Sequence, residues 1–259
     1  MKNILVILPC YNPSFEDWDR LKCFLEKNNL ERFDFQVIDD GSSRWTAPHF
    51  DLSTFSVKLE RLEKNLGKGG VIKDGIRFLE DRHQVYCFTD FDLPYSYEDL
   101  LGIAGSVLQG TEIVIGDRTG EGNPNYSTRL SRGLVHSLFR LAVRMIITGG
   151  IGDTQCGLKA FDAGCAKLIA SKSALNSFLF DVEWIYIALK HKLAVRCWPV
   201  TIQESHANTS LRNMKLGDNF IDSFRILLNI LQGRYYSKEL SEFAQTRRSR
   251  LVTKMRSEV

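Results

Sequence analysis

Long apolar runs and paired cysteines are both missing from this 259-residue sequence. A membrane-spanning helix needs about 18 consecutive apolar residues, and no stretch reaches that length. The apolar segment near the start ends at Pro9 and is too short for the core of a signal peptide. The six cysteines form no Cys-x-x-Cys pair and show no metal-site spacing. We therefore expect buried free thiols in a reducing compartment and a cytoplasmic location.

A strong charge of either sign is also missing. The 34 Lys and Arg residues nearly balance the 31 Asp and Glu residues, which argues against a dedicated nucleic-acid binder. The small basic excess lies at the C-terminus, where residues 234–259 hold seven Lys or Arg against three Glu. The other residues together carry a net charge of −1, so the basic excess is in the tail.

Strand and helix patterns alternate along the first two-thirds of the sequence. Short runs of β-forming residues predict strands, and apolar residues spaced three and four apart predict helices. Alternation of this kind is typical of an α/β domain with a mostly parallel sheet flanked by helices. The predicted strands are Ile4–Leu8, Phe35–Ile38, Lys58–Leu62, a run from Val85 and Glu112–Ile115, and the predicted helices are 14–29, 70–81 and 97–109.

Polar clusters follow several of these strands. Because the carboxyl ends of parallel strands meet at one edge of a sheet, the clusters should lie close together. Paired carboxylates suit Mg²⁺ or Mn²⁺, and such metals usually serve a phosphate-bearing substrate. Each cluster alone could be an ordinary turn, but together they predict a site for a nucleotide diphosphate. The clusters are Pro9–Asn12 with Tyr11, Asp39 with Asp40, Lys68, Asp90 with Asp92, and Asp117 with Arg118.

Five motifs then resemble a known family. They are Leu8-Pro-Cys-Tyr-Asn, Val37-Ile-Asp-Asp-Gly-Ser-Ser, Asn65-Leu-Gly-Lys-Gly-Gly, Phe88-Thr-Asp-Phe-Asp-Leu and Asp153-Thr-Gln-Cys-Gly-Leu-Lys-Ala-Phe. In this order they resemble the family 2 inverting glycosyltransferases of GT-A fold, from about residue 3 to about residue 230. Within that family they are most similar to the dolichyl- or polyprenyl-phosphate glucose and mannose synthases. The resemblance implies a metal-dependent hexosyltransferase with a Rossmann-like GT-A domain.

The resemblance also implies roles for individual residues. Asp90 and Asp92 would hold the metal, Mg²⁺ or Mn²⁺, together with the ribose and diphosphate of the donor. Leu93 and Pro94 stand where mannose synthases often have a Gln, so the third ligand stays open between water and His206. Arg118 and Arg129 would stabilise the leaving diphosphate with His206. The nucleotide would be bound by Pro9, Tyr11, Asn12, Asp39, Asp40, Lys68, Asp90 and His206.

The choice of acceptor depends on whether a base is needed. A sugar hydroxyl must lose a proton, for which Asp153, Asp181 or Glu183 could serve. A lipid phosphate is already ionised near neutral pH, with a second pKa of about 6, and needs only cations. The recurring basic residues at Arg129, Arg132, Arg140 and Arg144 favour the phosphate. A soluble or polysaccharide hydroxyl acceptor stays an alternative, as do a nucleotidyltransferase and a silent nucleotide-sugar binder.

The C-terminal part is predicted to be an extension. We expect the catalytic domain over 1–210, an amphipathic helix within 211–236 and a basic tail over 237–259. The helix and tail could lie at an anionic membrane surface, bind a separate membrane protein, or pack on the catalytic domain. The expected partners are UDP-glucose first, GDP-mannose second, a polyprenyl or dolichyl phosphate, and the cytoplasmic face of a membrane.

Overall fold

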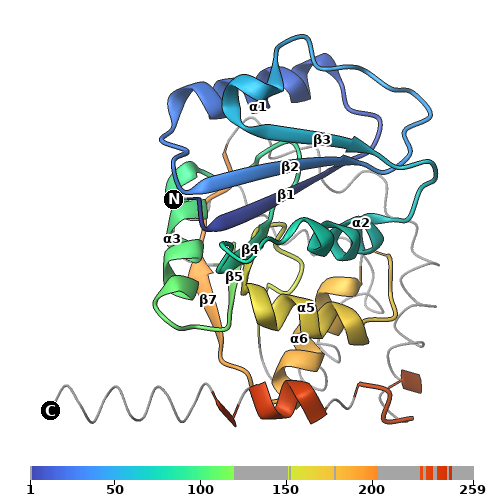
Figure 1. Cartoon of the computed structure of the whole chain (residues 1–259), viewed down its shortest axis with the longest axis vertical. Coiled ribbons are helices and arrows are strands. Elements are labelled where there is room, and N and C mark those ends of the chain that lie inside the picture. The colour runs from blue at the N-terminus through green and yellow to red at the C-terminus, as the bar shows by residue number, and fades with distance from the viewer. Residues whose placement is uncertain are drawn as a thin grey trace, which may run out of the picture.

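The computed structural model describes residues 2–119, 151, 153–177, 179–203, 228–229, 232–235, 238–243 and 245–246. Within these ranges the chain forms a seven-stranded sheet in the order β3-β2-β1-β4-β6-β5-β7 (Figure 1). The strands are β1 (Ile4–Cys10), β2 (Phe33–Asp39), β3 (Val57–Arg61), β4 (Val85–Phe88), β5 (Ile113–Asp117), β6 (Lys159–Asp162) and β7 (Val195–Pro199).

Most strands of the sheet run in one direction. β1 pairs in parallel with β2 and β4, β2 with β3, and β5 with β7. β6 is antiparallel to both of its neighbours, β4 and β5. The carboxyl ends of six strands therefore meet at one edge, which confirms the predicted mostly parallel sheet. The sequence did not predict the reversed strand β6.

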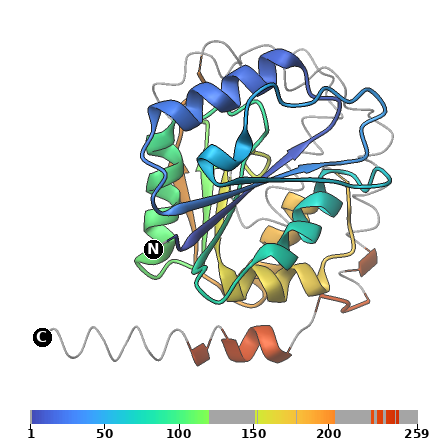
Figure 2. The same cartoon turned by 45° about the horizontal axis from the view of Figure 1, so that its top comes forward.

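Helices cover both faces of the sheet (Figures 1 and 2). One apolar cluster joins the sheet to α1 (Phe15–Lys27) and α3 (Tyr97–Leu108). A second cluster joins it to α2 (Lys68–Asp74), α5 (Ala163–Lys172) and α6 (Phe180–Lys190). Alternation in β1 divides its side chains between these clusters, because successive residues of a strand point to opposite faces. Two 3₁₀ turns, η1 (Leu52–Phe55) and η2 (Gly75–Phe78), complete the described elements.

Capping residues explain the starts of the two helices that were predicted best. Ser14 and Ser96 each accept a hydrogen bond from the third helical residue, Asp17 or Asp99, whose side chain bonds back. The single helix predicted over 70–81 is wrong in its bounds. It starts at Lys68, and after Asp74 it gives way to η2. At that point a Cβ on Gly75 would lie 2.8 Å from Ile7 Cγ1, so the backbone approaches the sheet too closely for a larger residue.

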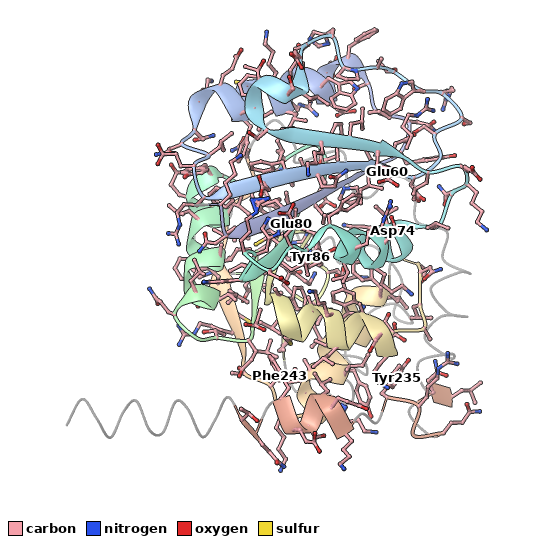
Figure 3. The ribbon with its side chains drawn as sticks, viewed as in Figure 1. Glu60, Asp74, Glu80, Tyr86, Tyr235 and Phe243 are labelled. Carbon is pink, nitrogen blue, oxygen red and sulfur yellow. The ribbon has the colours of Figure 1, made fainter. Side chains whose placement is uncertain are left out.

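The C-terminal segment packs, where it is described, against the helices that cover the sheet. Tyr235 and Leu240 are fully buried in the cluster that contains α5 and α6, and Figure 3 shows Tyr235 and Phe243 beside those helices. The Tyr235 hydroxyl donates to Glu183 Oε1 at 2.8 Å, and His191 Nε2 lies 2.9 Å from the Tyr235 carbonyl oxygen. Among the described helices, none combines the length and apolarity needed to cross a membrane.

Candidate functional site

The ends of the first three strands bring Asp39 and Arg61 together. The register places Cys10 beside Asp39 and Asp39 beside Arg61. Arg61 Nε donates to Asp39 Oδ2 at 3.1 Å, and the Arg61 guanidinium lies 4.2 Å from the centre of the Trp45 ring. The Ser42 hydroxyl also donates to Asp39. The buried carboxylate is thus held by several donors at the sheet edge, where the resemblance places the nucleotide base.

The loop after β1 carries Tyr11 and Asn12. The Tyr11 side chain is 52% exposed, so its ring is open to stack on a planar ligand. Asn12 adopts a positive φ of 52°. Its backbone N–H donates to Ser42 Oγ at 2.6 Å, and its Oδ1 accepts from the Arg44 N–H at 2.8 Å. Asn12 therefore connects this loop to the loop after β2. Pro9 lies within β1, one strand position before its end.

Asp40 holds the glycine-rich segment before α2. Its Oδ1 accepts from the Leu66 N–H at 2.5 Å and its Oδ2 from the Gly67 N–H at 2.9 Å. Burial raises the pKa of Asp40, and these two backbone hydrogen bonds oppose the rise. Gly67 has a positive φ of 80°, a conformation that favours glycine. Because both oxygens of Asp40 bind the chain itself, this residue places Lys68 at the start of α2.

Lys68 and Asp90 form a short ion pair. Lys68 Nζ lies 2.5 Å from Asp90 Oδ1, with the two side chains 15% and 31% exposed. Burial acts against both charges, but the pairing outweighs it, so the pKa of Lys68 is raised and the pKa of Asp90 is lowered. The pair joins the start of α2 to the end of β4. It gives this edge a fixed carboxylate and a fixed ammonium group side by side.

Asp90 and Asp92 lie on a tight turn. The Leu93 N–H donates to the Asp90 carbonyl oxygen at 3.0 Å, and Leu93 has a positive φ of 49°. Phe91, between the two acids, is 7% exposed, and its ring centre lies 4.9 Å from that of Trp18. The bulky residue is therefore part of the core on the α1 side, and its burial fixes the turn that carries both carboxylates.

The Asp153–Phe161 motif lies directly against Asp90. A Cβ on Gly157 would fall 2.0 Å from Asp90 Oδ2, so only glycine fits there without displacing the carboxylate. The buried Tyr95 hydroxyl accepts from the Gly157 N–H at 3.2 Å and from Cys156 Sγ at 3.3 Å. Neither Tyr95 nor Gly157 was predicted to have a role of its own in the site. The glycine within the motif was the one signal that pointed to a close approach.

Arg118 and Asp153 form a bidentate pair. Arg118 Nε lies 2.7 Å from Asp153 Oδ2, and Nη2 lies 2.7 Å from Oδ1. The Arg118 backbone N–H also donates to Oδ2 at 2.9 Å. Burial acts against the guanidinium charge, but Asp153 outweighs it and raises the pKa of Arg118. The two residues, predicted as separate catalytic groups, thus lie together, and the charge of each is balanced by the other.

These oxygen donors can hold a divalent cation only if a bound phosphate compound supplies further oxygen ligands. Within the described ranges, no three or more His, Cys, Asp and Glu side chains group together as a cage. Asp90 and Asp92 are two carboxylates on one turn, and Mg²⁺ is commonly bound by one or two carboxylates plus substrate phosphates. The pair therefore suits a cation shared with a diphosphate. Arg129 and His206 lie outside the described residues, as do Arg132, Arg140 and Arg144.

Comparison with known proteins gives a consistent family. The sequence matches the family described as Glycosyl transferase family 2 over residues 5–175. A dolichyl-phosphate beta-glucosyltransferase from Dictyostelium discoideum is 30% identical over 251 residues, covering 89% of this chain and 73% of that protein. The protein of that name from Homo sapiens is 28% identical over 213 residues, covering 75% of this chain. This chain spans only 65% of the human relative.

Solved structures share the fold at lower identity. Glucosyl-3-phosphoglycerate synthase from Mycobacterium tuberculosis in complex with uridine diphosphate superimposes with a TM-score of 0.59 at 18% identity, covering 90% of this chain and 80% of that chain. The same protein with Mn²⁺, UDP-glucose and phosphoglyceric acid gives a TM-score of 0.57 at 15% identity, with the same coverage. At such identities the likeness shows the fold alone.

Proposed function

We propose that this chain, which belongs to glycosyl transferase family 2, transfers glucose with inversion from UDP-glucose to dolichyl phosphate or another polyprenyl phosphate. The names of the relatives from Dictyostelium discoideum and Homo sapiens support glucose and a dolichyl phosphate acceptor. The UDP-glucose bound by the structural neighbour supports the donor. The motifs that resemble the glucose synthases favour the same donor over GDP-mannose.

The choice of a phosphate acceptor rests on the hydrogen bonds and ion pairs of three carboxylates. Asp153 pairs with Arg118, and Asp181 Oδ1 lies 2.9 Å from Lys159 Nζ. Glu183 is fully buried, and it accepts hydrogen bonds from Ser173, Ala174, Leu175 and Tyr235. All three candidate bases are thus engaged by the chain. A phosphate acceptor needs no base, because it is ionised before it attacks.

The proposed reaction follows from the positions of the strand-end residues. Tyr11 and Asp39 would contact the base of the donor, Tyr11 by stacking and Asp39 by accepting from a ring N–H. Asp90 and Asp92 would hold the cation, and a cation bound there would supply positive charge to the nucleoside diphosphate as it leaves. Lys68 would add a positive charge beside the same diphosphate, where charge develops in the transition state. The ionised oxygen of the lipid phosphate would then attack the sugar carbon from the opposite side, which inverts the configuration there.

The basic C-terminal residues support a place at the membrane. A lipid phosphate is held in a bilayer, so the enzyme must reach the surface that presents it. The tail from Arg247 to Arg256 carries five Lys or Arg, and clusters of basic residues are attracted to the anionic cytoplasmic leaflet. We therefore propose a peripheral association with the cytoplasmic face, either directly or through a membrane protein.

A transfer assay tests the proposal. Purified protein with Mg²⁺ or Mn²⁺ and labelled UDP-glucose should glucosylate a polyprenyl phosphate, giving a label that extracts into organic solvent. The matched control is the corresponding polyprenol, which has the same chain and no phosphate, and it should stay unlabelled. A parallel series with GDP-mannose tests the second donor. Transfer to a soluble sugar hydroxyl without lipid would point to the hydroxyl-acceptor alternative, and no transfer from any common nucleotide sugar would defeat the proposal.

A further inference from the structure

Lys159 and Asp181 form a buried ion pair that the proposed reaction does not use. Their side chains are 1% and 5% exposed, with Nζ 2.9 Å from Oδ1. Lys159 also lies over the Phe88 ring, 5.6 Å from its centre. A buried pair is expensive to desolvate, and a well-packed apolar pair often gives equal or greater stability. Stability alone therefore does not explain why two charges lie in this part of the core.

Lys159 connects two segments that reach Asp90. Its Nζ donates to the Cys156 carbonyl oxygen at 2.5 Å, which fixes the loop that presses Gly157 against Asp90. Its backbone pairs with Phe88 at the end of β4, two residues before Asp90. A shift of Lys159 would therefore move both the strand that carries Asp90 and the loop that lies behind it.

Asp181 connects the pair to the segment that carries Lys68. It lies in the first turn of α6. The preceding residue, Phe180, packs so closely on α2 that a Cβ on Gly69 would lie 2.6 Å from Phe180 Cβ. The Gly70 N–H donates to the Asn176 carbonyl oxygen at 3.2 Å. The charge of Asp181 also contributes, after that of Asp90, to the raised pKa of Lys68. The start of α2 thus packs against the start of α6 and the segment before it, next to Asp181.

We propose that Lys159 and Asp181 are positioning residues. Their pairing holds the Gly157 loop and the starts of α2 and α6 together. Asp90 and Lys68 are thereby held in place for the donor diphosphate and its cation. The inference rests on the proposed function in one respect, which is that the donor binds at Asp90. Asp90, Lys68, Asp181 and Lys159 form a group of two negative and two positive charges. Loss of Asp181 alone leaves the buried Lys159 to compete with the cation for Asp90.

The experiment separates positioning from stability by comparing single and double variants. Asp181→Asn and Lys159→Met each leave one buried charge unpaired, and both should lower the melting temperature. The double variant, Lys159→Met with Asp181→Asn, leaves neither charge and should regain most of the lost stability. We expect this stable double variant to bind UDP with Mn²⁺ at least tenfold more weakly than the unaltered chain. In the transfer assay its KM for the donor should rise and its KM for the lipid phosphate should stay unchanged.

The matched control is the exposed pair of Lys238 and Glu242, which lie 3.6 Å apart. The double variant Lys238→Met with Glu242→Gln should change neither the melting temperature nor the UDP affinity. The inference would be overturned if the double variant of Lys159 and Asp181 had the melting temperature of the unaltered chain and a UDP affinity within twofold of it. If that double variant does not fold, Lys159→Arg decides, since it keeps the charge and moves the contact. A folded Lys159→Arg with weakened UDP affinity supports positioning, and unaltered affinity overturns it.

Calorimetric binding of UDP and Mn²⁺ keeps the two proposals distinguishable. If the unaltered chain binds UDP with Mn²⁺ and transfers no glucose to a lipid phosphate, the proposed function fails while the positioning role is still tested by affinity. If the unaltered chain transfers glucose and the stable double variant does so with the same KM for the donor, the positioning role is wrong and the proposed function stands. If neither UDP nor GDP binds with a divalent cation, both proposals fail.

Discussion

Lys68 Nζ contacts Asp90 Oδ1 at 2.5 Å and thereby joins the glycine-rich segment to the end of β4. Asp40 holds that segment through two backbone N–H groups, and Gly157 leaves room for the other oxygen of Asp90. Three motifs that lie far apart in the sequence therefore determine the position of one carboxylate. The consequences of this arrangement can be measured.

Asp92→Asn should reduce transfer by about 10²–10³-fold, because it removes a negative ligand from the cation that we propose Asp90 and Asp92 hold beside the leaving diphosphate. The carboxamide has nearly the same shape, so the free energy of unfolding should change by no more than about 0.5 kcal/mol. Steady-state transfer kinetics and urea unfolding check the two parts. Glu98→Gln, an exposed acid in the first turn of α3, is the control and should retain full activity. Turnover by Asp92→Asn at the unaltered rate would contradict the assignment.

Gly157→Ala should abolish donor binding through a purely steric effect. The new Cβ would fall 2.0 Å from Asp90 Oδ2, so the carboxylate must leave its position. Gly105→Ala in α3 is the matched control, since apart from its chain neighbours and the nearby backbone of its own helix no atom lies within 4 Å of the added Cβ. That change should leave transfer intact and add up to about 1 kcal/mol of stability, because alanine is a better helix former than glycine. Calorimetric titration with UDP and Mn²⁺ distinguishes the variants, and equal affinity in both would refute a close fit at Gly157.

Tyr235→Phe should loosen the C-terminal segment. The change removes the hydroxyl that donates to the buried Glu183 carboxylate at 2.8 Å, and a hydrogen bond to a charged group contributes about 1.5–3 kcal/mol. Residues 238–243 should then exchange amide hydrogens faster and be cleaved more readily by a protease. Tyr186→Phe is the control, because no hydrogen bond from its hydroxyl occurs among the described residues and its ring lies 5.6 Å from that of Tyr235. Equal protection in both variants would argue against a clamp at Tyr235.

Asp34→Asn should weaken the fold in a pH-dependent way. Burial alone would raise the pKa of Asp34, but the His83 hydrogen bond and the charges of Lys2 and Arg82 outweigh it and hold the pKa below its ordinary value of 3.8. A depressed pKa stabilises the folded state above the unfolded value, and the effect disappears as the pH falls through the folded value.

The difference in unfolding free energy between Asp34→Asn and the unaltered chain should accordingly be full at pH 6 and shrink below pH 3.8. Urea unfolding over this range measures it. Asp81→Asn, an exposed acid on the turn before β4, should show no such trend. A difference for Asp34→Asn that stays constant with pH would show that the ion pairs contribute nothing.

Local patterns were sufficient for much of the fold and for the identity of the strand-end residues. The strand predicted at Lys58–Leu62 differs by one residue at each end from β3, and two predicted helices coincide with capped helices. The reversed strand β6 and the helices α5 and α6 were not predicted. Short buried elements lack a clear period, and the direction of a strand depends on partners distant in the sequence.

The sequence alone could not show which charged residues form ion pairs with one another. Arg118 and Asp153 were predicted as separate catalytic groups, and their pairing depends on contacts across 35 positions of the chain. Asp181 and Glu183 were both possible bases, because a carboxylate in a sequence shows neither its burial nor its hydrogen-bond donors. The roles of Arg129 and His206, which lie outside the described residues, stay predictions.

The sequence by itself determined the α/β class, the family resemblance and the set of polar residues at the strand ends, because these depend on local periodicity and on short motifs. Only the tertiary structure decided which of those residues face one another. Lys68 meets Asp90, and Lys159 meets Asp181 behind them, because strand register and helix packing bring together groups that no local spacing relates. That arrangement, rather than the residues alone, holds Asp90 and Asp92 at the edge of the sheet where we propose that the donor diphosphate binds.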